Sequence, residues 1–401
     1  MADAPEEPVA YSTEIIQPFP SAGRAWGKVY APRDPASIPP RARLYGAFLQ
    51  RQTVSLTVAP GGFGKSSLAI VEALALATGK PLLHEQPIRP CRVALWNGED
   101  AEDELFRRVE AARLAHAVSG DALGDRLILG NAEFQPMQLA RQSSKGVEID
   151  EAAKADMVRW LRAAAVDAWI IDPFVCAHSV SENDNGAVQL VLRALASIAI
   201  QADCAIHLVH HARKTAGPVE IDDARGASSL IAAVRAARVL NVMSAEDHER
   251  WSPDASRFAY VSIADGKANF APRSDTLRWF ELREQRLGNV TALYPAGDFI
   301  GVPVIWEPPG LFDDITAHDL LSAQRAIAAD GPWLLANQGA RTARRRIAEA
   351  LGWDTEQKES MRKLSVIIKY WIANRAFRVS IITDEKRRQR EALEVDQWAD
   401  A

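Results

Sequence analysis

A glycine-rich turn between two apolar segments is the part of the sequence whose residue types most clearly specify a chemistry. Residues 54–59 are mostly apolar and β-branched, and residues 65–78 have the composition of an apolar helix. The turn fits the pattern [AG]xxxxGK[ST], with Ala59 at its first position and Lys65 and Ser66 at its end. The residues of this segment are Ala59, Pro60, Gly61, Gly62, Phe63, Gly64, Lys65, Ser66 and Ser67.

A strand, a glycine-rich turn and a helix that begins with Lys-Ser together predict a phosphate-binding P-loop. Glycines let backbone N–H groups face a phosphate, and the helix N-terminus favours negative charge. We expect Lys65 to reach the β- and γ-phosphates and the Ser66 hydroxyl to ligate Mg²⁺. The predicted ligands are therefore a nucleoside triphosphate and Mg²⁺. No base-reading motif in the sequence decides between ATP and another triphosphate.

Two carboxylates follow apolar strands, where open α/β sheets bind their ligands. Asp172 ends the run 168–172 and fits a Walker B aspartate that holds Mg²⁺ directly or through water. The alternative is an Asp that only caps the next turn. Glu99 follows the run 91–97, where it is placed to orient an attacking water. Its alternative role is a charge at the start of the next helix.

Polar residues also end the last strong apolar run. His210 and His211 lie where a side chain can hydrogen-bond a γ-phosphate, although such a pair is more often structural or metal-binding. No third ligand stands at a suitable spacing, so zinc is disfavoured. Arg213 and Lys214 follow in a basic loop that contains Gly and Pro, and Arg225 is a candidate arginine finger from a neighbouring subunit. The alternative for Arg225 is a solvated loop arginine.

The elements that must position these residues alternate between strand and helix. Continuous apolar strands in this arrangement predict an α/β fold with a mostly parallel central sheet covered on both faces. Residues 141–150 show no clear period, residues 257–306 suggest short antiparallel strands, and residues 1–40 suggest a partly ordered tail. The expected strands are 53–58, 91–97, 126–130, 168–172 and 205–211, and the expected helices are 65–78, 100–116, 151–165, 186–202 and 228–238.

Composition limits the remaining possibilities. The chain has 401 residues, a formal net charge of −5 and a pI near 6.0, so nucleic-acid contacts must come from local patches. Cys91, Cys176 and Cys204 have no disulfide or metal spacing and suggest buried thiols in a reducing compartment. The acidic N-terminus is unlike a signal sequence, and no stretch reaches transmembrane length. We therefore expect a cytoplasmic protein without a membrane partner.

A second domain is expected at 316–401, after an ATPase domain at 41–310. Helical patterns at 317–329, 340–352 and 356–374 precede a short strand pair, which suggests a winged-helix module. Its positive surface predicts contact with duplex DNA phosphates or with replication proteins. The alternatives are a solvated helical face or a subunit-docking module, and an acidic tail at 384–401 is placed to fold back on it. The basic residues are Arg341, Arg344, Arg345, Arg346, Arg362, Lys363, Lys369, Arg375 and Arg378.

Five segments in this order resemble RecA-fold P-loop ATPases of the plasmid RepA hexameric helicase type, over roughly residues 40–270. The resemblance implies a homo-oligomeric, hexameric ring with ATP at each subunit interface. It also implies that Glu99 activates water, that His211 rather than His210 senses the γ-phosphate, and that the loop 213–224 faces a central channel. The segments are Ala59-Pro-Gly-Gly-Phe-Gly-Lys-Ser, Asn97-Gly-Glu-Asp, Ile171-Asp-Pro-Phe, Val209-His-His-Ala-Arg-Lys and Asp223-Ala-Arg-Gly-Ala-Ser-Ser.

The resemblance leads us to expect an ATP-hydrolysing motor on single-stranded DNA, a replicative helicase of phage or plasmid replication. One alternative is a RecA-like recombinase, mediator or loader ATPase that displaces no strand. Another is a nucleotide-switched regulator that binds duplex DNA. The sequence decides neither the ring size nor the loading partner.

Overall fold

The computed structural model describes residues 30–143, 146–211, 228–251, 255–269, 277–310, 313, 315–335, 341–383 and 387–399. The chain divides into two compact units, Met1–Arg41 and Ala42–Ala401. In the described part of the first unit, Asp34 caps the short 3-10 helix η1 (Pro35–Ser37) through a hydrogen bond from the Ala36 N–H. The remaining elements belong to the second unit.

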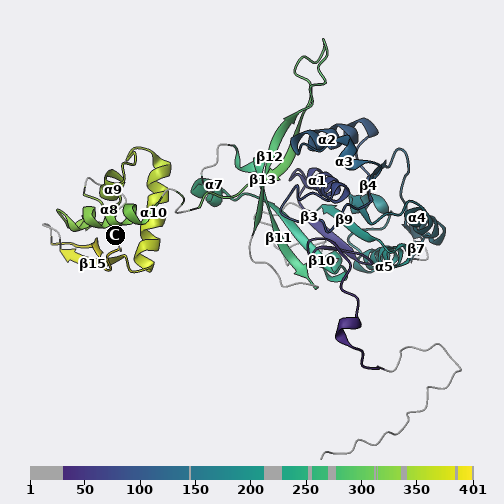
Figure 1. The fold of residues 1–401 in the computed structure, drawn as a ribbon, viewed down its shortest axis with the longest axis horizontal. Helices are drawn as coiled ribbons and strands as arrows, with labels where there is room; N and C mark the ends of the chain where they lie inside the picture. The colour runs from purple at the N-terminus through teal and green to yellow at the C-terminus, as the bar shows by residue number, and fades with distance from the viewer. Residues whose placement is uncertain are drawn as a thin grey trace, which may run out of the picture. The chain divides into compact units, whose positions relative to one another are not determined.

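A nine-stranded sheet, in the order β13-β12-β11-β10-β3-β9-β8-β4-β5, forms the centre of this unit (Figure 1). The six strands from β10 to β5 are parallel, and β11, β12 and β13 extend the sheet in antiparallel fashion. The mostly parallel α/β sheet that the sequence predicts is thus confirmed. The strands are β3 (Val54–Ala59), β4 (Val93–Asn97), β5 (Leu127–Asn131), β8 (Ala168–Asp172), β9 (Ala205–His211), β10 (Ala236–Val242), β11 (Tyr260–Ala268), β12 (Arg278–Arg286) and β13 (Phe299–Ile305).

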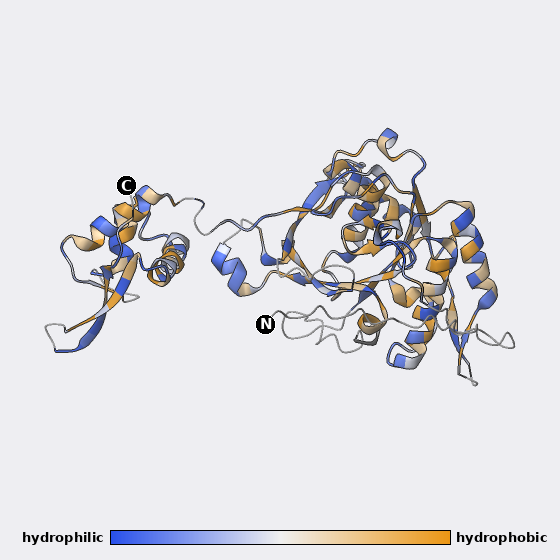
Figure 2. Cartoon of the chain, turned by 60° about the horizontal axis from the view of Figure 1, so that its bottom comes forward, coloured by the Kyte–Doolittle hydropathy of each residue, from blue (hydrophilic) through white to orange (hydrophobic). Residues whose placement is uncertain are grey.

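Helices cover both faces of the sheet, because the central strands are apolar on both sides. On one face α1 (Lys65–Thr78) and α2 (Glu102–Ala115) share an apolar core with the sheet. On the other face α4 (Glu151–Ala163), α5 (Asn185–Ala202) and α6 (Ser228–Ala233) share a second core. Figure 2 shows apolar residues (orange) concentrated between these layers and polar residues (blue) on the outer helices.

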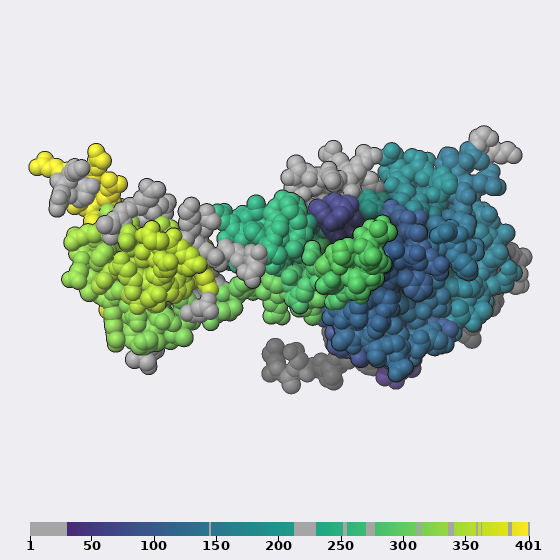
Figure 3. Space-filling model, turned by 90° about the horizontal axis from the view of Figure 1, so that it is seen from above, coloured from purple at the N-terminus to yellow at the C-terminus, as the bar shows by residue number. Residues whose placement is uncertain are grey.

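The β12–β13 ribbon packs beside α2, and its green surface lies against the blue surface of the first half of the chain in Figure 3. The exposed end of the ribbon carries Leu293 and Tyr294. The smaller elements of the unit are the hairpin of β1 (Arg43–Tyr45) and β2 (Leu49–Gln50), α3 (Gly120–Leu123), η2 (Phe174–Ala177), α7 (Ala245–Trp251) and η3 (Arg257–Ala259).

The structure differs from the sequence-based prediction at several places. Residues 141–150 contain the hairpin of β6 (Ala140–Ser143) and β7 (Gly146–Ile149). The helix expected over 228–238 ends at Ala233, because the following residues form β10. Cys176 is only partly buried, unlike the other two cysteines.

One helix meets the length and composition criteria for a membrane span, contrary to expectation. This helix is α5 (Asn185–Ala202), which has 18 residues. Nine of its residues are buried in the core, so its apolar side covers the sheet. Burial within a folded core explains such a sequence as well as a bilayer does.

The C-terminal part has its own apolar core, to which three helices and a three-stranded antiparallel sheet contribute. Its sheet order is β14-β16-β15. The third strand, β14, was not predicted, because it has only two residues. The elements follow as α8 (Ala317–Ala328), β14 (Trp333–Leu334), α9 (Ala343–Ala350), α10 (Lys358–Ala373), β15 (Phe377–Thr383) and β16 (Gln389–Val395).

Candidate active site

The predicted P-loop connects β3, in the middle of the sheet, to α1. Gly62 and Gly64 have φ angles of +85° and +73°, a region that side chains rarely tolerate. A Cβ on Gly64 would also lie 2.8 Å from Leu282 Cδ2 of β12, whereas Gly61 and Gly62 face open space. The turn therefore needs glycine for its backbone and for its packing, and it leaves room above the backbone for a phosphate.

Lys65 is buried at the start of α1, with only 4% of its surface exposed. Its Nζ donates a hydrogen bond to Pro60 O at 2.8 Å, which folds the side chain over its own loop. Burial lowers the pKa of Lys65, and the charges of Asp172 and Glu99 oppose that shift. The ammonium group therefore lies in the electrostatic field of both carboxylates, at the position where a phosphate would replace Pro60 O as its acceptor.

Asp172 ends β8 and is only 2% exposed. Burial raises its pKa from 3.8 to about 6, although a hydrogen bond with Ser66 and the charge of Lys65 oppose the rise. Its Oδ1 atom has no hydrogen-bond partner among the described residues. A buried carboxylate oxygen that accepts no hydrogen bond and a nearby serine hydroxyl are oxygen ligands of the kind that Mg²⁺ prefers. Asp172 and Ser66 thus fit the metal-binding roles expected of them.

Glu99 lies in the turn that follows β4. Asn97 is paired with Asp172 across β4 and β8, and the Gly98 N–H donates to Asp172 O at 2.8 Å. Asn97 Oδ1 accepts hydrogen bonds from the backbone N–H groups of Glu99 (2.8 Å) and Asp100 (2.7 Å). This turn presents the Glu99 side chain, which is 53% exposed, beside Asp172. Asn97 was not among the predicted site residues, although Asn in a turn before Gly is the signal that could have identified it.

The alternative role of Glu99 as a helix-start charge does not match its position. Helix α2 begins at Glu102, and its first-turn acids are Glu102, Asp103 and Glu104. Glu99 precedes the N-cap residue Ala101 and lies outside the helix.

His210 and His211 point to opposite faces of the sheet, because side chains alternate along a strand. His211 shares its face with Val209, which packs in the core of α1. His210 shares the other face with Leu208, which packs in the core of α5. The structure therefore places His211, and not His210, on the side of the P-loop helix.

The partners of the two histidines differ accordingly. His211 Nε2 lies 3.6 Å from Glu99 Oε1, and His210 Nδ1 lies 3.5 Å from Glu182 Oε1. Burial lowers the pKa of His210 to about 4, and burial and Lys65 lower that of His211 against the pull of Glu99. His210 contacts the ring of Phe174 at 6.4 Å between centroids. Near neutral pH both rings are uncharged and can donate or accept a single proton.

The expected nucleic-acid residues fall in two regions. Arg213, Lys214 and the arginine-finger candidate Arg225 lie outside the described residues. Arg344 Nη1 donates to Ser365 Oγ at 3.0 Å on α10.

Arg345 pairs with Glu349 at 3.4 Å and lies 3.9 Å from Glu356. The acidic tail adds two further pairs, Arg375 with Asp396 and Arg378 with Glu394. Exposed ion pairs are weak, so these carboxylates lower the net positive charge of the surface without holding the arginine side chains firmly in place.

Residues 27–217 match the family model described as an AAA domain. The matched range contains the P-loop, Glu99, Asp172 and His211, which the sheet brings to one edge. The match supports ATPase activity, and this edge of the sheet holds the side chains that such an activity requires. Residues 27–217 are thus similar to AAA-type P-loop ATPase domains, which supports a P-loop ATPase.

Proposed function

We propose that this ATPase is a homo-oligomeric motor that acts on single-stranded DNA, a replicative helicase of the RepA type in phage or plasmid replication. The observation that carries the proposal is the 3.6 Å approach of His211 to Glu99. His211 ends β9, and the basic segment with Arg213 and Lys214 follows directly in the sequence. If the contact between His211 and Glu99 changes when the γ-phosphate leaves, the change would be passed along the chain to the segment with Arg213 and Lys214, which we propose holds DNA.

In this proposal the residues of one subunit divide the chemistry among them. Lys65 exchanges Pro60 O for the phosphate oxygens of ATP, and Ser66 and Asp172 hold Mg²⁺. Glu99 accepts a proton from the attacking water, and neutral His211 exchanges its contact with Glu99 for a γ-phosphate oxygen. Mg²⁺, when bound, supplies positive charge that neutralises the developing negative charge.

We further propose that Arg225 of one subunit completes the site of the next, within a hexameric ring. Arg238, on β10 beside the P-loop strand β3, is not available as an arginine finger. Its guanidinium is committed to Glu72 and Thr57 inside the core. An arginine from another subunit then supplies the cation that stabilises the transition state.

We propose that the C-terminal part is a winged helix, because its elements follow in the order helix, strand, helix, helix and strand pair, and the hairpin β15–β16 would be its wing. We propose that it binds duplex DNA or a replication protein through the surface that contains Arg344 and Arg345. Because its acid–base pairs are exposed, DNA phosphates can replace the carboxylates. We place the protein in the cytoplasm.

ATP hydrolysis with and without single-stranded DNA, together with strand displacement on a forked duplex, tests the proposal. Wild type is compared with Lys65→Ala and with Lys80→Ala, an exposed lysine just after α1 that serves as the matched control. Stimulated hydrolysis and displacement that fail only in Lys65→Ala support a helicase. Stimulated hydrolysis without displacement favours a recombinase or loader, and hydrolysis that ignores single-stranded DNA refutes the motor.

A further inference from the structure

A charged side chain in the middle of β10 is fully enclosed by the core. Arg238 is 2% exposed, and its two terminal nitrogens donate to the two carboxylate oxygens of Glu72 at 2.6 and 2.5 Å. Its Nε donates to Thr57 Oγ1 at 2.8 Å, and its guanidinium lies 3.8 Å from the ring centroid of Phe48. All the donor nitrogens of Arg238 therefore have partners with fixed geometry.

The hydrogen-bond network continues from Thr57 to β9, the strand that ends with His211. Thr57 Oγ1 lies 3.0 Å from His207 Nε2, and His207 Nδ1 lies 3.1 Å from Ser55 Oγ. Burial and the charge of Arg238 lower the pKa of His207, so its ring is neutral. Thr57 accepts from Arg238 and donates to Nε2, and Nδ1–H donates to Ser55, whose hydroxyl is 3.4 Å from Ile206 O. This single arrangement satisfies every member of the chain.

The network joins the elements that carry the active site. Glu72 lies on α1 about two turns after Lys65. Thr57 lies on β3 just before the P-loop, and His207 lies on β9, four residues before His211 and on the same face of the sheet. Arg238 itself lies on β10, which follows α6.

Stability alone does not explain this arrangement. Replacing a buried ion pair with apolar side chains of similar volume is often neutral or stabilising. Apolar side chains can repack in more than one arrangement when they are substituted, whereas a bidentate pair fixes both distance and angle. The pair is therefore better suited to setting position than to holding the fold together.

We infer that Arg238 and Glu72 are positioning residues for the nucleotide site. They fix α1, and with it Lys65 and Ser66, relative to the strands that carry the P-loop and His211. The inference rests on nucleotide binding at the site of the proposed function, but not on hydrolysis, DNA or ring formation.

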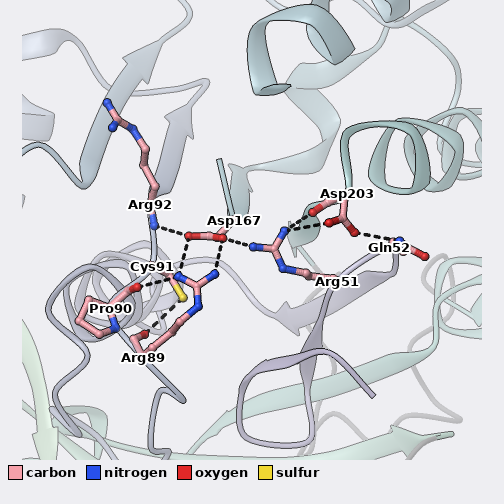
Figure 4. Close-up of polar contacts among 8 residues, drawn as sticks. All are labelled: Arg51, Gln52, Arg89, Pro90, Cys91, Arg92, Asp167 and Asp203. Atoms are coloured by element: carbon pink, nitrogen blue, oxygen red, sulfur yellow. Dashed lines mark hydrogen bonds and ion pairs between the residues drawn. The ribbon is translucent and has the colours of Figure 1, made fainter. Parts of the chain in front are cut away.

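A second ion cluster in the same sheet provides a matched control (Figure 4). Asp167, 7% exposed, lies just before β8, at the edge of the parallel strands opposite the P-loop. It accepts hydrogen bonds from Arg51, from Arg89 at 2.9 Å and from the Arg92 N–H at 2.7 Å. Like the Arg238 network it contains a buried carboxylate paired with arginine, but its arginines are 20% (Arg51) and 52% (Arg89) exposed, and among the described residues its hydrogen bonds and ion pairs reach no site residue.

The experiment compares the Glu72→Met/Arg238→Met double variant, Thr57→Val and Asp167→Asn with wild type, without DNA. Thermal unfolding, the Kd of a fluorescent ATP analogue, and the KM and kcat of hydrolysis are measured for each. We expect the Met pair to stay folded while Kd and KM rise about tenfold or more and kcat falls. Thr57→Val, which keeps the ion pair and the side-chain volume, should show a smaller change in the same direction. Asp167→Asn should lower the unfolding temperature and leave Kd, KM and kcat within about twofold.

Wild-type nucleotide affinity in a folded Met pair overturns the inference. So does an equal change in Asp167→Asn, since it would show that any buried ion pair has this effect. If the Met pair does not fold, Thr57→Val decides, and a folded Thr57→Val with wild-type Kd also overturns it. If wild type binds but does not hydrolyse ATP, the proposed function fails while the Kd comparison still tests the positioning role.

Discussion

Replacing Asp172 with Asn should stabilise the nucleotide-free protein and abolish its activity. Burial raises the pKa of Asp172 from 3.8 to about 6, so the folded state holds its proton more tightly than the unfolded state does. Stability is therefore lost as pH rises through this window. Above pH 6 the ionised carboxylate costs about 3 kcal/mol.

Asn removes that cost but introduces one of its own. Among the described residues Oδ1 of Asp172 has no hydrogen-bond partner, so the amide group of Asn is left with an unsatisfied donor or acceptor. Such a group costs about 1 kcal/mol. The expected net gain is about 2 kcal/mol at about pH 8, falling toward zero at about pH 4.5, where most of the carboxyl is already protonated in the folded protein.

Urea unfolding at both pH values, in a chelator and without nucleotide, measures the gain. Asp121→Asn, an exposed residue of α3, is the control and should change stability by less than about 0.5 kcal/mol. In parallel, Mg²⁺-dependent ATP hydrolysis should be lost in Asp172→Asn only. A gain of equal size at both pH values, or a loss of stability at the higher pH, refutes this account of the buried carboxylate.

Three further outcomes are expected. Gly64→Ala should weaken ATP binding at least about tenfold in a nucleotide titration, because its Cβ meets Leu282 at a φ of +73°, and adding Leu282→Ala should restore part of the loss. Glu99→Gln should keep ATP binding while turnover falls about 100-fold or more, whereas Glu102→Gln on α2 should behave as wild type. Burial lowers the pKa of His178 to about 4, so wild type should lose stability as pH falls from 6.5 toward 4, and His178→Gln should flatten that loss in acid unfolding. Unchanged ATP affinity in Gly64→Ala, unchanged turnover in Glu99→Gln, or an unchanged acid unfolding profile in His178→Gln would each contradict the corresponding prediction.

The sequence predicted the parts of the fold whose patterns are local. Strand β3, the P-loop and α1 follow from composition and glycine spacing alone, and Asp172 and Glu99 follow from their places after apolar runs. Strand β10 was missed because Arg238 in its middle resembles the polar face of a helix. Its burial depends on Glu72, which is distant in sequence, and a pairing of this kind leaves no local signal.

The role of each of two adjacent residues, and the partner of a charged residue, also depended on the three-dimensional fold. The order of motifs favoured His211 over His210, and strand alternation supplies a geometric reason that no linear pattern contains. The charges of the C-terminal part were visible in the sequence, but their pairing with Glu394 and Asp396 was not. The register of β15 and β16 places Arg378 opposite Glu394, and Arg375 and Asp396 lie just outside the two strands.

The contact between Gly64 and Leu282 bears on how this protein can be divided. The family match ends at residue 217. However, Leu282, which packs against Gly64 of the P-loop, lies on β12, and Arg238, which pairs with Glu72 of α1, lies on β10. A chain shortened to the matched range would keep the P-loop, Glu99, Asp172 and His211, but it would lose the segment with Arg225 and the strands that pack against the P-loop and α1. We therefore expect that the smallest fragment that folds and binds nucleotide extends through β13, the last strand of the nine-stranded sheet.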